Sequence, residues 1–255
     1  MANYAGKKAV IIGGTHGMGF ATAQQLIEAG AKVLLTGRSQ PPLEKAKAQL
    51  SDKATIVQTD VTVLSSIEQL VDQTKAAFGA DPQIDFLFIN AGYAHLEPFA
   101  LVSEESFRRT VDTNLFGSFF VAQKFAPLVS DSGAIIFTSS VSAKIGIPGM
   151  AVYSASKAAA SSLVQTLAAE LATRKIRVNA VTPGFIKTPT MGVSGVTADD
   201  LVAFEAEGSK LTPLDRIGTP EEVAKAAIFL AFEATFTTGS ELFVDGGLIN
   251  LQKGH

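Results

Sequence analysis

The sequence predicts an α/β protein with a doubly wound fold, in which a seven-stranded parallel sheet carries helices on both faces. Two observations support this prediction. Short apolar, β-branched runs alternate with helical patterns from near the start, which is the order of a parallel sheet joined by right-handed crossovers. No linker, repeat or low-complexity tract interrupts the alternation, so we expect residues 1–255 to form a single domain.

The strands are predicted from apolar runs of strand length. The run IDFLFINAG at 84–92 is rich in apolar residues along its length, as expected for a strand with both faces covered. A helix that runs to Ala29 separates the first two strands. The seven candidate strands are the runs at 8–13, 31–37, 54–60, 84–92, 133–140, 176–184 and 241–247.

Two of the intervening helices show start signals. Ser65 and Glu68 have the spacing of a capping box. Thr219, Pro220 and Glu222 supply a cap, a first-turn proline and a box partner. We therefore expect helices to begin at both places.

The least regular segment is 186–218, between the sixth strand and the helix at Thr219. It contains VTADDLVAFEAEG, a candidate for a short amphipathic helix. An excursion of this length in a compact α/β domain is typical of a lid over a substrate site, and a plain surface insertion is the alternative.

Composition and charge exclude several classes of function. Apolar residues make up 47% of the chain and charged residues 18%, which favours a well-filled core. Lysine and arginine number 21 against 24 acidic residues, a net charge of −3, and no dense basic cluster is present. Neither nucleic acid nor a membrane surface is therefore an expected partner.

Cysteine and histidine usage argues against metal chemistry. The chain has no cysteine, which excludes disulfides, thiolate zinc sites and cysteine nucleophiles. Its histidines, His16, His95 and His255, are too scattered to suggest a ligand set, so we expect no metal. No segment resembles a signal peptide or a membrane span, and we expect a cytoplasmic protein.

The stretch VIIGGTHGMGFA follows the first strand and opens a helix, where parallel sheets bind ligands. Gly13, Gly17 and Gly19 are spaced G-x-x-x-G-x-G and not G-x-G-x-x-G. A helix amino terminus offers free N–H groups and a positive dipole to a pyrophosphate, and glycines let the backbone approach it. The pattern favours a dinucleotide site, although glycines also serve ordinary tight turns.

The end of the second strand indicates which dinucleotide binds. An NAD site needs an acidic residue there to hold the ribose hydroxyls, whereas this chain has Gly37 followed by Arg38. A guanidinium suits a 2′-phosphate, and His16 offers a second donor. We therefore expect NADP(H) to be preferred over NAD(H); the alternative is that Arg38 is an ordinary surface arginine.

Taken with NAG at 90–92 and YSASK at 153–157, the glycine turn makes the chain resemble the short-chain dehydrogenase/reductases. The resemblance covers essentially the whole length. Further matching motifs are TDV at 59–61, Asn114 in VDTNLFGSFF, SS at 139–140, PGFIKT at 183–188 and VDGG at 244–247. The chain departs from the family pattern at Ile12, where threonine is common, and at the additional Gly14.

The resemblance implies a Rossmann-type fold and a role for each matching residue. Asn114, Ser140, Tyr153 and Lys157 match the catalytic tetrad, with Lys157 also holding the nicotinamide ribose and Asn114 anchoring a proton-relaying water. It further implies a homotetramer, or a dimer, paired through the helices of Asn114 and Tyr153. The implied cofactor-binding residues are Gly13, Thr15, His16, Gly17, Met18, Gly19, Arg38, Asp60, Val61, Asn90, Ala91, Gly92, Tyr153, Lys157, Pro183, Gly184, Ile186 and Thr188.

Tyr153 and Lys157 are four residues apart, so a helix directs both side chains the same way. We expect the Lys157 ammonium to favour the phenolate and lower the pKa of Tyr153 toward neutrality. Tyr153 would protonate the oxygen of a carbonyl that receives hydride, while Ser140 stabilises that oxygen by a hydrogen bond.

The predicted substrate pocket is mostly apolar, which favours a neutral ketone or its secondary alcohol. We expect an NADPH-dependent carbonyl reductase, with two alternatives. One is a 3-oxoacyl carrier-protein reductase, for which Arg174, Lys175 and Arg177 offer basic residues; the other is a non-catalytic NADP-sensing protein on the same fold. The candidate pocket residues are His95, Leu96, Ser142, Ile147, Met150, Phe185, Met191 and Val193.

Overall fold

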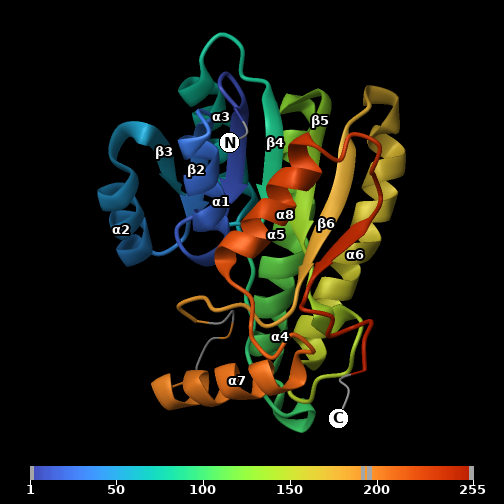
Figure 1. Ribbon diagram of the computed structural model, residues 1–255. Helices are drawn as coiled ribbons and strands as arrows, with labels where there is room; N and C mark the ends of the chain where they lie inside the picture. Colours follow the sequence, from blue (N-terminus) through green and yellow to red (C-terminus); the bar gives the residue numbers. More distant parts are fainter. Residues whose placement is uncertain (1–2, 191–192, 194–196, 253–255) are drawn as a thin grey trace.

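The computed structural model describes residues 3–190, 193 and 197–252, and its centre is a seven-stranded sheet of parallel strands in the order β3-β2-β1-β4-β5-β6-β7 (Figure 1). This confirms the predicted fold class. The strands are β1 (Lys8–Ile12), β2 (Lys32–Gly37), β3 (Ala54–Gln58), β4 (Ile84–Ile89), β5 (Val129–Thr138), β6 (Arg177–Pro183) and β7 (Glu241–Val244).

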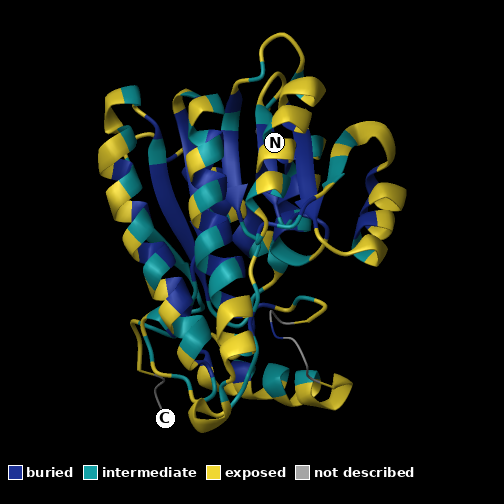
Figure 2. Ribbon diagram, turned by 180° about the vertical axis from the view of Figure 1, so that it is seen from behind, coloured by how far each residue is buried: buried dark blue, intermediate teal, exposed yellow. Residues whose placement is uncertain are grey.

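Helices cover both faces of the sheet, and the strands between them are buried (Figure 2). Successive residues of β1 show why: Val10 packs with α3, α5 and α6, whereas Ile11 packs with α1, α2 and α8. The helices are α1 (Gly17–Glu28), α2 (Gln40–Leu50), α3 (Leu64–Phe78), α4 (Glu104–Val111), α5 (Gly117–Phe125), α6 (Ala151–Leu171), α7 (Ala198–Leu211) and α8 (Pro220–Phe232).

The strand order reverses beside β1, which pairs with β2 on one side and with β4 on the other. At such a switch point, the connections leave the carboxyl ends of the strands in opposite directions and open a crevice for a ligand. The predicted glycine turn connects β1 to α1 at this point. The fold therefore places the turn where an open parallel sheet binds its ligands.

Helices begin at both predicted places, but the capping box expected for Ser65 and Glu68 is wrong. Thr219 and Glu222 form a capping box at the start of α8. Helix α3 begins at Leu64 without a side-chain cap, and it is the next serine, Ser66, whose hydroxyl accepts a hydrogen bond from the Asp60 N–H at 3.1 Å. Because that bond ties the helix to the end of β3, Ser66 fixes the loop and Ser65 points outward.

Helix α7 confirms the amphipathic helix expected within 186–218, with a capping box between Thr197 and Asp200. In the part of the chain that the structure describes, no helix is long and apolar enough to cross a membrane.

The neighbouring serines provide a test of this correction. Replacing Ser66 by Ala leaves the Asp60 N–H without its partner, and we expect a loss of about 1 kcal/mol of unfolding free energy. Ser65→Ala is the matched control and should change stability by less than about 0.5 kcal/mol. Urea unfolding of both variants measures this, and equal effects at the two serines would contradict the assignment.

Candidate active site

A cleft runs across the carboxyl ends of β1 to β5, from Arg38 at one end to Tyr153 and Lys157 at the other. Most residues expected to contact a cofactor line it, although they come from distant parts of the chain. The predicted residues in its lining are Gly13, Thr15, His16, Gly17, Met18, Arg38, Asp60, Val61, Asn90, Ala91, Gly92, Tyr153, Lys157 and Thr188.

The glycine turn forms a tight cradle in which side chains have no room. Gly13 has φ +79°, and a Cβ added to it would lie 2.8 Å from the backbone of Ala91. A Cβ on Gly19 would lie 2.3 Å from the Gly13 carbonyl oxygen, so Gly19 shapes the turn from behind without lining the cleft. The turn therefore presents backbone N–H groups to the cleft at the start of α1, which fits the pyrophosphate of a dinucleotide.

The far end of the cleft carries a cation and no acid at the end of β2. Gly37 is buried against the glycine turn, where a Cβ would lie 2.5 Å from the Thr15 methyl group. Arg38 and Ser39 follow it, exposed and in the cleft lining. His16 lies on the same wall, and partial desolvation in the cleft lowers the pKa of its imidazole from 6.5, so it is neutral at pH 7.

The Asp60 carboxylate lies at this end but is committed to its own loop. Its Oδ1 accepts hydrogen bonds from the Thr62 backbone N–H at 2.9 Å and from the Thr62 hydroxyl at 2.7 Å. Asp60 therefore stabilises the turn after β3. Both Asp60 and the adjacent Val61 line the cleft.

Tyr153 and Lys157 lie one turn apart on α6, at the other end of the cleft. The Lys157 Nζ is 5.7 Å from the centre of the Tyr153 ring and donates a hydrogen bond to the Thr138 carbonyl oxygen at 2.8 Å. Lys157 is 5% exposed, and burial lowers its pKa to about 8. The amine is still mostly protonated at pH 7.

The expected direction of the Tyr153 pKa shift is wrong. Burial raises the pKa of the phenol above 10, and a hydrogen bond with Ser140 opposes part of that rise. Lys157 does not offset the burial, because its ammonium is directed at the Thr138 carbonyl. Tyr153 is therefore a protonated phenol at neutral pH, which suits it to donate a proton.

Ser140 lies beside Tyr153, at the end of β5, and accepts two hydrogen bonds from Ser142. The Ser142 N–H and the Ser142 hydroxyl donate to the Ser140 Oγ at 3.2 and 3.0 Å. With its oxygen occupied as an acceptor, the Ser140 hydroxyl keeps its hydrogen for donation, as its hydrogen bond with Tyr153 indicates.

Asn114 is buried in a π-helical segment between α4 and α5, outside the cleft lining. Its amide bonds both backbone groups of Tyr93, at 2.7 Å to the N–H and 2.8 Å to the carbonyl, and its Nδ2 donates to the Ser156 hydroxyl at 2.9 Å. The side chain thus ties the loop after β4 to α6. The proton-relaying water stays a prediction.

The residues expected around the nicotinamide divide between two places. Thr188 lies in the cleft against Gly17, whereas Pro183 ends β6 and Ile186 is buried, both outside the lining. Gly184 lines a second, smaller pocket next to Tyr153.

This second pocket is lined by apolar side chains and by hydroxyl-bearing residues in comparable measure. Of the expected substrate residues it contains Ser142, Ile147, Met150, Phe185 and Val193, but neither His95 nor Leu96, and Met191 lies outside the described residues. The other lining residues are Ala94, Ser140, Val141, Tyr153, Gly184 and Phe204.

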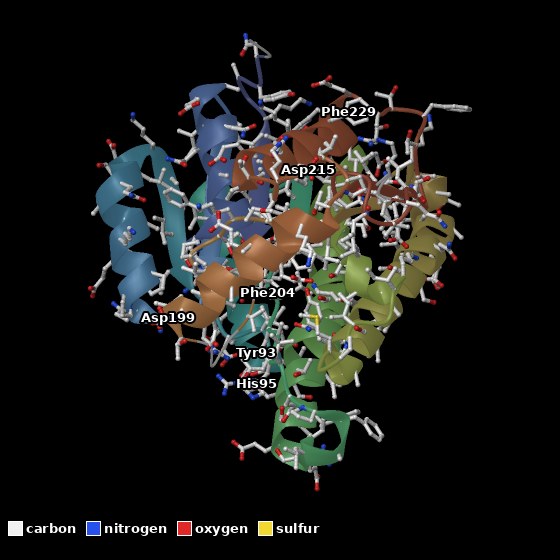
Figure 3. All side chains as sticks on the ribbon, turned by 60° about the horizontal axis from the view of Figure 1, so that its bottom comes forward. Tyr93, His95, Asp199, Phe204, Asp215 and Phe229 are labelled. Carbon is white, nitrogen blue, oxygen red and sulfur yellow. The ribbon has the colours of Figure 1, made fainter. Side chains whose placement is uncertain are left out.

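Phe204 was not predicted from the sequence. It reaches the pocket from α7, where its ring packs edge-on against Phe185 with centroids 5.1 Å apart. Figure 3 shows Phe204 at the same end of the molecule as Tyr93 and His95, which follow β4. The apolar face of the amphipathic stretch 196–208 was the signal that could have identified it.

The described residues contain no group of three or more His, Asp or Glu side chains that could hold a metal ion. Among the described residues, the two cavities carry hydroxyl groups, the Lys157 amine and the side chains of His16, Arg38, Asp60 and Asn90.

Comparisons with known proteins agree with this geometry over nearly the whole chain. A family model described as enoyl-(acyl carrier protein) reductase matches residues 13–249. L-fucose dehydrogenase from Mus musculus is 34% identical over 252 residues, which cover 97% of this chain and 90% of that protein.

Two solved structures extend the likeness to the fold. A short-chain type dehydrogenase/reductase from Mycobacterium marinum has a TM-score of 0.86 at 32% identity, covering 98% of each chain. A 3-ketoacyl-(acyl-carrier-protein) reductase from Brucella melitensis, solved in complex with NADH, has a TM-score of 0.85 at 29% identity, covering 96% of this chain and 99% of that chain.

Sequence, fold and the arrangement of the cleft thus agree. The chain belongs to the short-chain dehydrogenase/reductase family, and it is an oxidoreductase that acts on alcohol and carbonyl groups with a nicotinamide cofactor.

Proposed function

We propose that the protein is an NADPH-dependent carbonyl reductase, which in reverse is a secondary alcohol dehydrogenase, for a neutral and largely apolar ketone. The observation that carries the proposal is the pocket in which apolar side chains lie beside Tyr153 and Ser140. Arg38 at the end of β2 supports NADP(H) as the cofactor, since no carboxylate stands there to hold free ribose hydroxyls.

The bound cofactor supplies hydride to the substrate carbon, and the chain's own residues manage the oxygen. Ser140 directs its hydroxyl hydrogen at that oxygen, because Ser142 occupies its acceptor positions. Tyr153, protonated at neutral pH because burial raises its pKa, donates the proton that completes the alcohol. The Lys157 ammonium holds a positive charge at this end of the cleft and binds the cofactor ribose.

The remaining cofactor contacts are proposed from where the residues lie in the fold. The glycine turn of Gly13, Gly17 and Gly19 holds the pyrophosphate, and Arg38 with His16 holds the 2′-phosphate. The family resemblance assigns the rest, with Asp60 and Val61 beside the adenine, Asn90–Gly92 stabilising the end of β4 beside the cofactor, and Pro183–Thr188 beside the nicotinamide.

The pocket lining favours an apolar substrate over a sugar. Among the described residues, its polar side chains are Ser140, Ser142 and Tyr153; the Ser142 hydroxyl is bonded to Ser140, and the proposal assigns Ser140 and Tyr153 to the reacting oxygen. The ring hydroxyls of a sugar would lose water there without gaining partners, which costs about 1–3 kcal/mol each. An apolar ketone has no such cost.

The segment 186–218 is proposed as the lid of this pocket. Phe204 of α7 packs on Phe185, and the exposed Lys187 forms an ion pair with Glu205 at 2.7 Å. These contacts connect α7 to the segment that carries Thr188. Closing over the substrate would exclude water from the transferred hydride and proton.

A homotetramer in the cytoplasm is part of the same proposal. Phe99, Phe107 and Phe119 are exposed around α4 and α5, and such apolar surface suits a contact between subunits.

The carrier-protein alternative is supported by the 3-ketoacyl-(acyl-carrier-protein) reductase among the similar structures and by a relative named 3-oxoacyl-[acyl-carrier-protein] reductase, 36% identical over 250 residues. Two of the three basic residues offered for it have other roles in this chain. Arg174 pairs with Asp131 and donates to two backbone carbonyls, and Arg177 donates to carbonyls at the end of α8. Both guanidiniums are therefore explained without an acidic partner protein.

A panel of carbonyl compounds tests the proposal. With NADPH, we expect faster turnover of an aryl ketone than of L-fucono-lactone or an acetoacetyl thioester. The loss of reduced-nicotinamide absorbance measures the turnover. Tyr153→Phe should reduce turnover by about 10²–10⁴-fold while NADPH binding is kept. A thioester preference would favour the carrier-protein reductase, and NADPH binding with no turnover in the wild type would favour the sensor.

The cofactor preference has its own test. We expect Arg38→Ala to lower the ratio of kcat/KM with NADPH to that with NADH by about ten- to hundredfold, since one charged hydrogen bond is lost. Lys45→Ala, which removes an exposed positive charge from the neighbouring α2, should leave the ratio unchanged. An unchanged ratio in Arg38→Ala would show that Arg38 is an ordinary surface residue.

The buried amine predicts a pH dependence of stability. Below pH 8, Lys157 is charged in both the folded and the unfolded state, so the folded protein carries the full free-energy cost of burying the ammonium. As pH rises from about 8 to about 10.5, the folded state loses its proton before the unfolded state does, so stability rises by on the order of 3 kcal/mol.

Lys157→Met lacks this titration and serves as the comparison. We expect the unfolding free energy of the wild type without cofactor to gain up to about 3 kcal/mol on that of the variant between pH 8 and 10.5. Urea unfolding at both pH values measures the difference, with Lys45→Met as the exposed control. A constant difference would mean that Lys157 titrates like an exposed lysine.

A further inference from the structure

Thr59 carries a buried hydroxyl group without a hydrogen-bond partner, the one such side-chain atom among the described residues. The residue is 4% exposed, directly after β3, and it lines the cleft. It was not among the residues expected to bind the cofactor. A buried hydroxyl normally has a partner, because leaving it unpaired is expensive.

Backbone bonds place Thr59 at the adenosine end of the cleft. Its N–H donates to the Gly37 carbonyl oxygen at 2.9 Å, and the preceding Gln58 donates its side-chain amide to the Arg38 carbonyl, also at 2.9 Å. Thr59 is thus held beside the end of β2. Its neighbours in the cleft lining are Gly37, Arg38 and Asp60.

The protein does not offer Thr59 a partner of its own. The Oδ1 of the adjacent Asp60 accepts hydrogen bonds from Thr62, and the Asp60 N–H donates to the Ser66 hydroxyl. Other threonines of the cleft are paired within the protein: Thr36 accepts from the Gly13 N–H, and Thr138 donates to Asn90. The unpaired state of Thr59 is therefore particular to this position.

We infer that Thr59 is a cofactor-binding residue, whose hydroxyl forms a hydrogen bond with the adenosine half of the bound nicotinamide dinucleotide. A hydroxyl donates and accepts, and the adenine edge and the ribose offer groups of both kinds. Binding the dinucleotide removes the cost of the unpaired hydroxyl, which becomes a gain in affinity. The inference depends on the nicotinamide cofactor of the family and not on the preference for NADP(H).

Thr59→Val tests this, because valine keeps the shape and removes the hydroxyl. We expect the Kd values of NADPH and NADH to rise by the same factor, about three- to tenfold. Reduced nicotinamide mononucleotide, which lacks the adenosine half, should bind within twofold of the wild-type value. Thr59→Ser, which keeps the hydroxyl, should retain the affinity for both dinucleotides. Fluorescence titration of the full chain measures all of these constants.

Stability without cofactor supplies a readout independent of binding. Thr59→Val removes an unpaired buried hydroxyl, so its melting temperature should equal or exceed that of the wild type, by up to about 2–4 °C. Thr74→Val is the matched control: this fully buried threonine donates to the Leu70 carbonyl at 2.8 Å, and the variant should melt below the wild type.

Three results would overturn the inference. They are an unchanged dinucleotide affinity in Thr59→Val, an equal loss for the mononucleotide, or a drop in melting temperature as large as that of Thr74→Val. A failure of the NADP(H) preference is distinguishable, because it appears in Arg38→Ala as an unchanged cofactor ratio and leaves the Thr59 result intact.

Discussion

A chain of hydrogen bonds joins the glycine turn to the amine of α6, and the geometry of the site depends on it. Asn90 donates to the Gly13 carbonyl at 2.8 Å, Thr138 donates to the Asn90 side chain at 3.0 Å, and Lys157 donates to the Thr138 carbonyl at 2.8 Å. This series of hydrogen bonds crosses the carboxyl ends of β1, β4 and β5 in turn. The cradle for the pyrophosphate and the ammonium beside Tyr153 are therefore held in one frame, set by the register of the sheet.

This hydrogen-bonded frame holds two buried groups that lower the stability of the protein without cofactor. Lys157 holds a charge that burial disfavours, and Thr59 holds a hydroxyl that no residue pairs. The strands beneath supply compensating stability, since β4 contributes Phe86 and Phe88, fully buried between the sheet and the layer of α1 and α8. Binding sites commonly carry such local costs, because a ligand rather than the fold completes them.

The sequence predicted the features that follow from a residue pattern, such as the strands. Predictions that depend on the direction of a side chain failed. Apolar runs located all seven strands, because strands covered on both faces need apolar residues along their length. Spacing alone could not tell Ser65 from Ser66, since the difference is which hydroxyl faces Asp60. The pKa of Tyr153 was predicted in the wrong direction, because spacing gives the distance to Lys157 but not the burial or the carbonyl that binds its ammonium.

Tyr153 is the one described residue that lines both the cofactor cleft and the substrate pocket. The cleft is built from backbone, hydroxyls and charges at strand ends, whereas the pocket adds apolar side chains from the loop before α6 and from α7 to the hydroxyl groups near Tyr153. On the proposed function, substitutions at Ile147 or Phe204 would alter substrate choice without disturbing the nucleotide site. Because the two cavities meet at a single phenol, Tyr153 would deliver its proton where a bound nicotinamide cofactor would supply hydride.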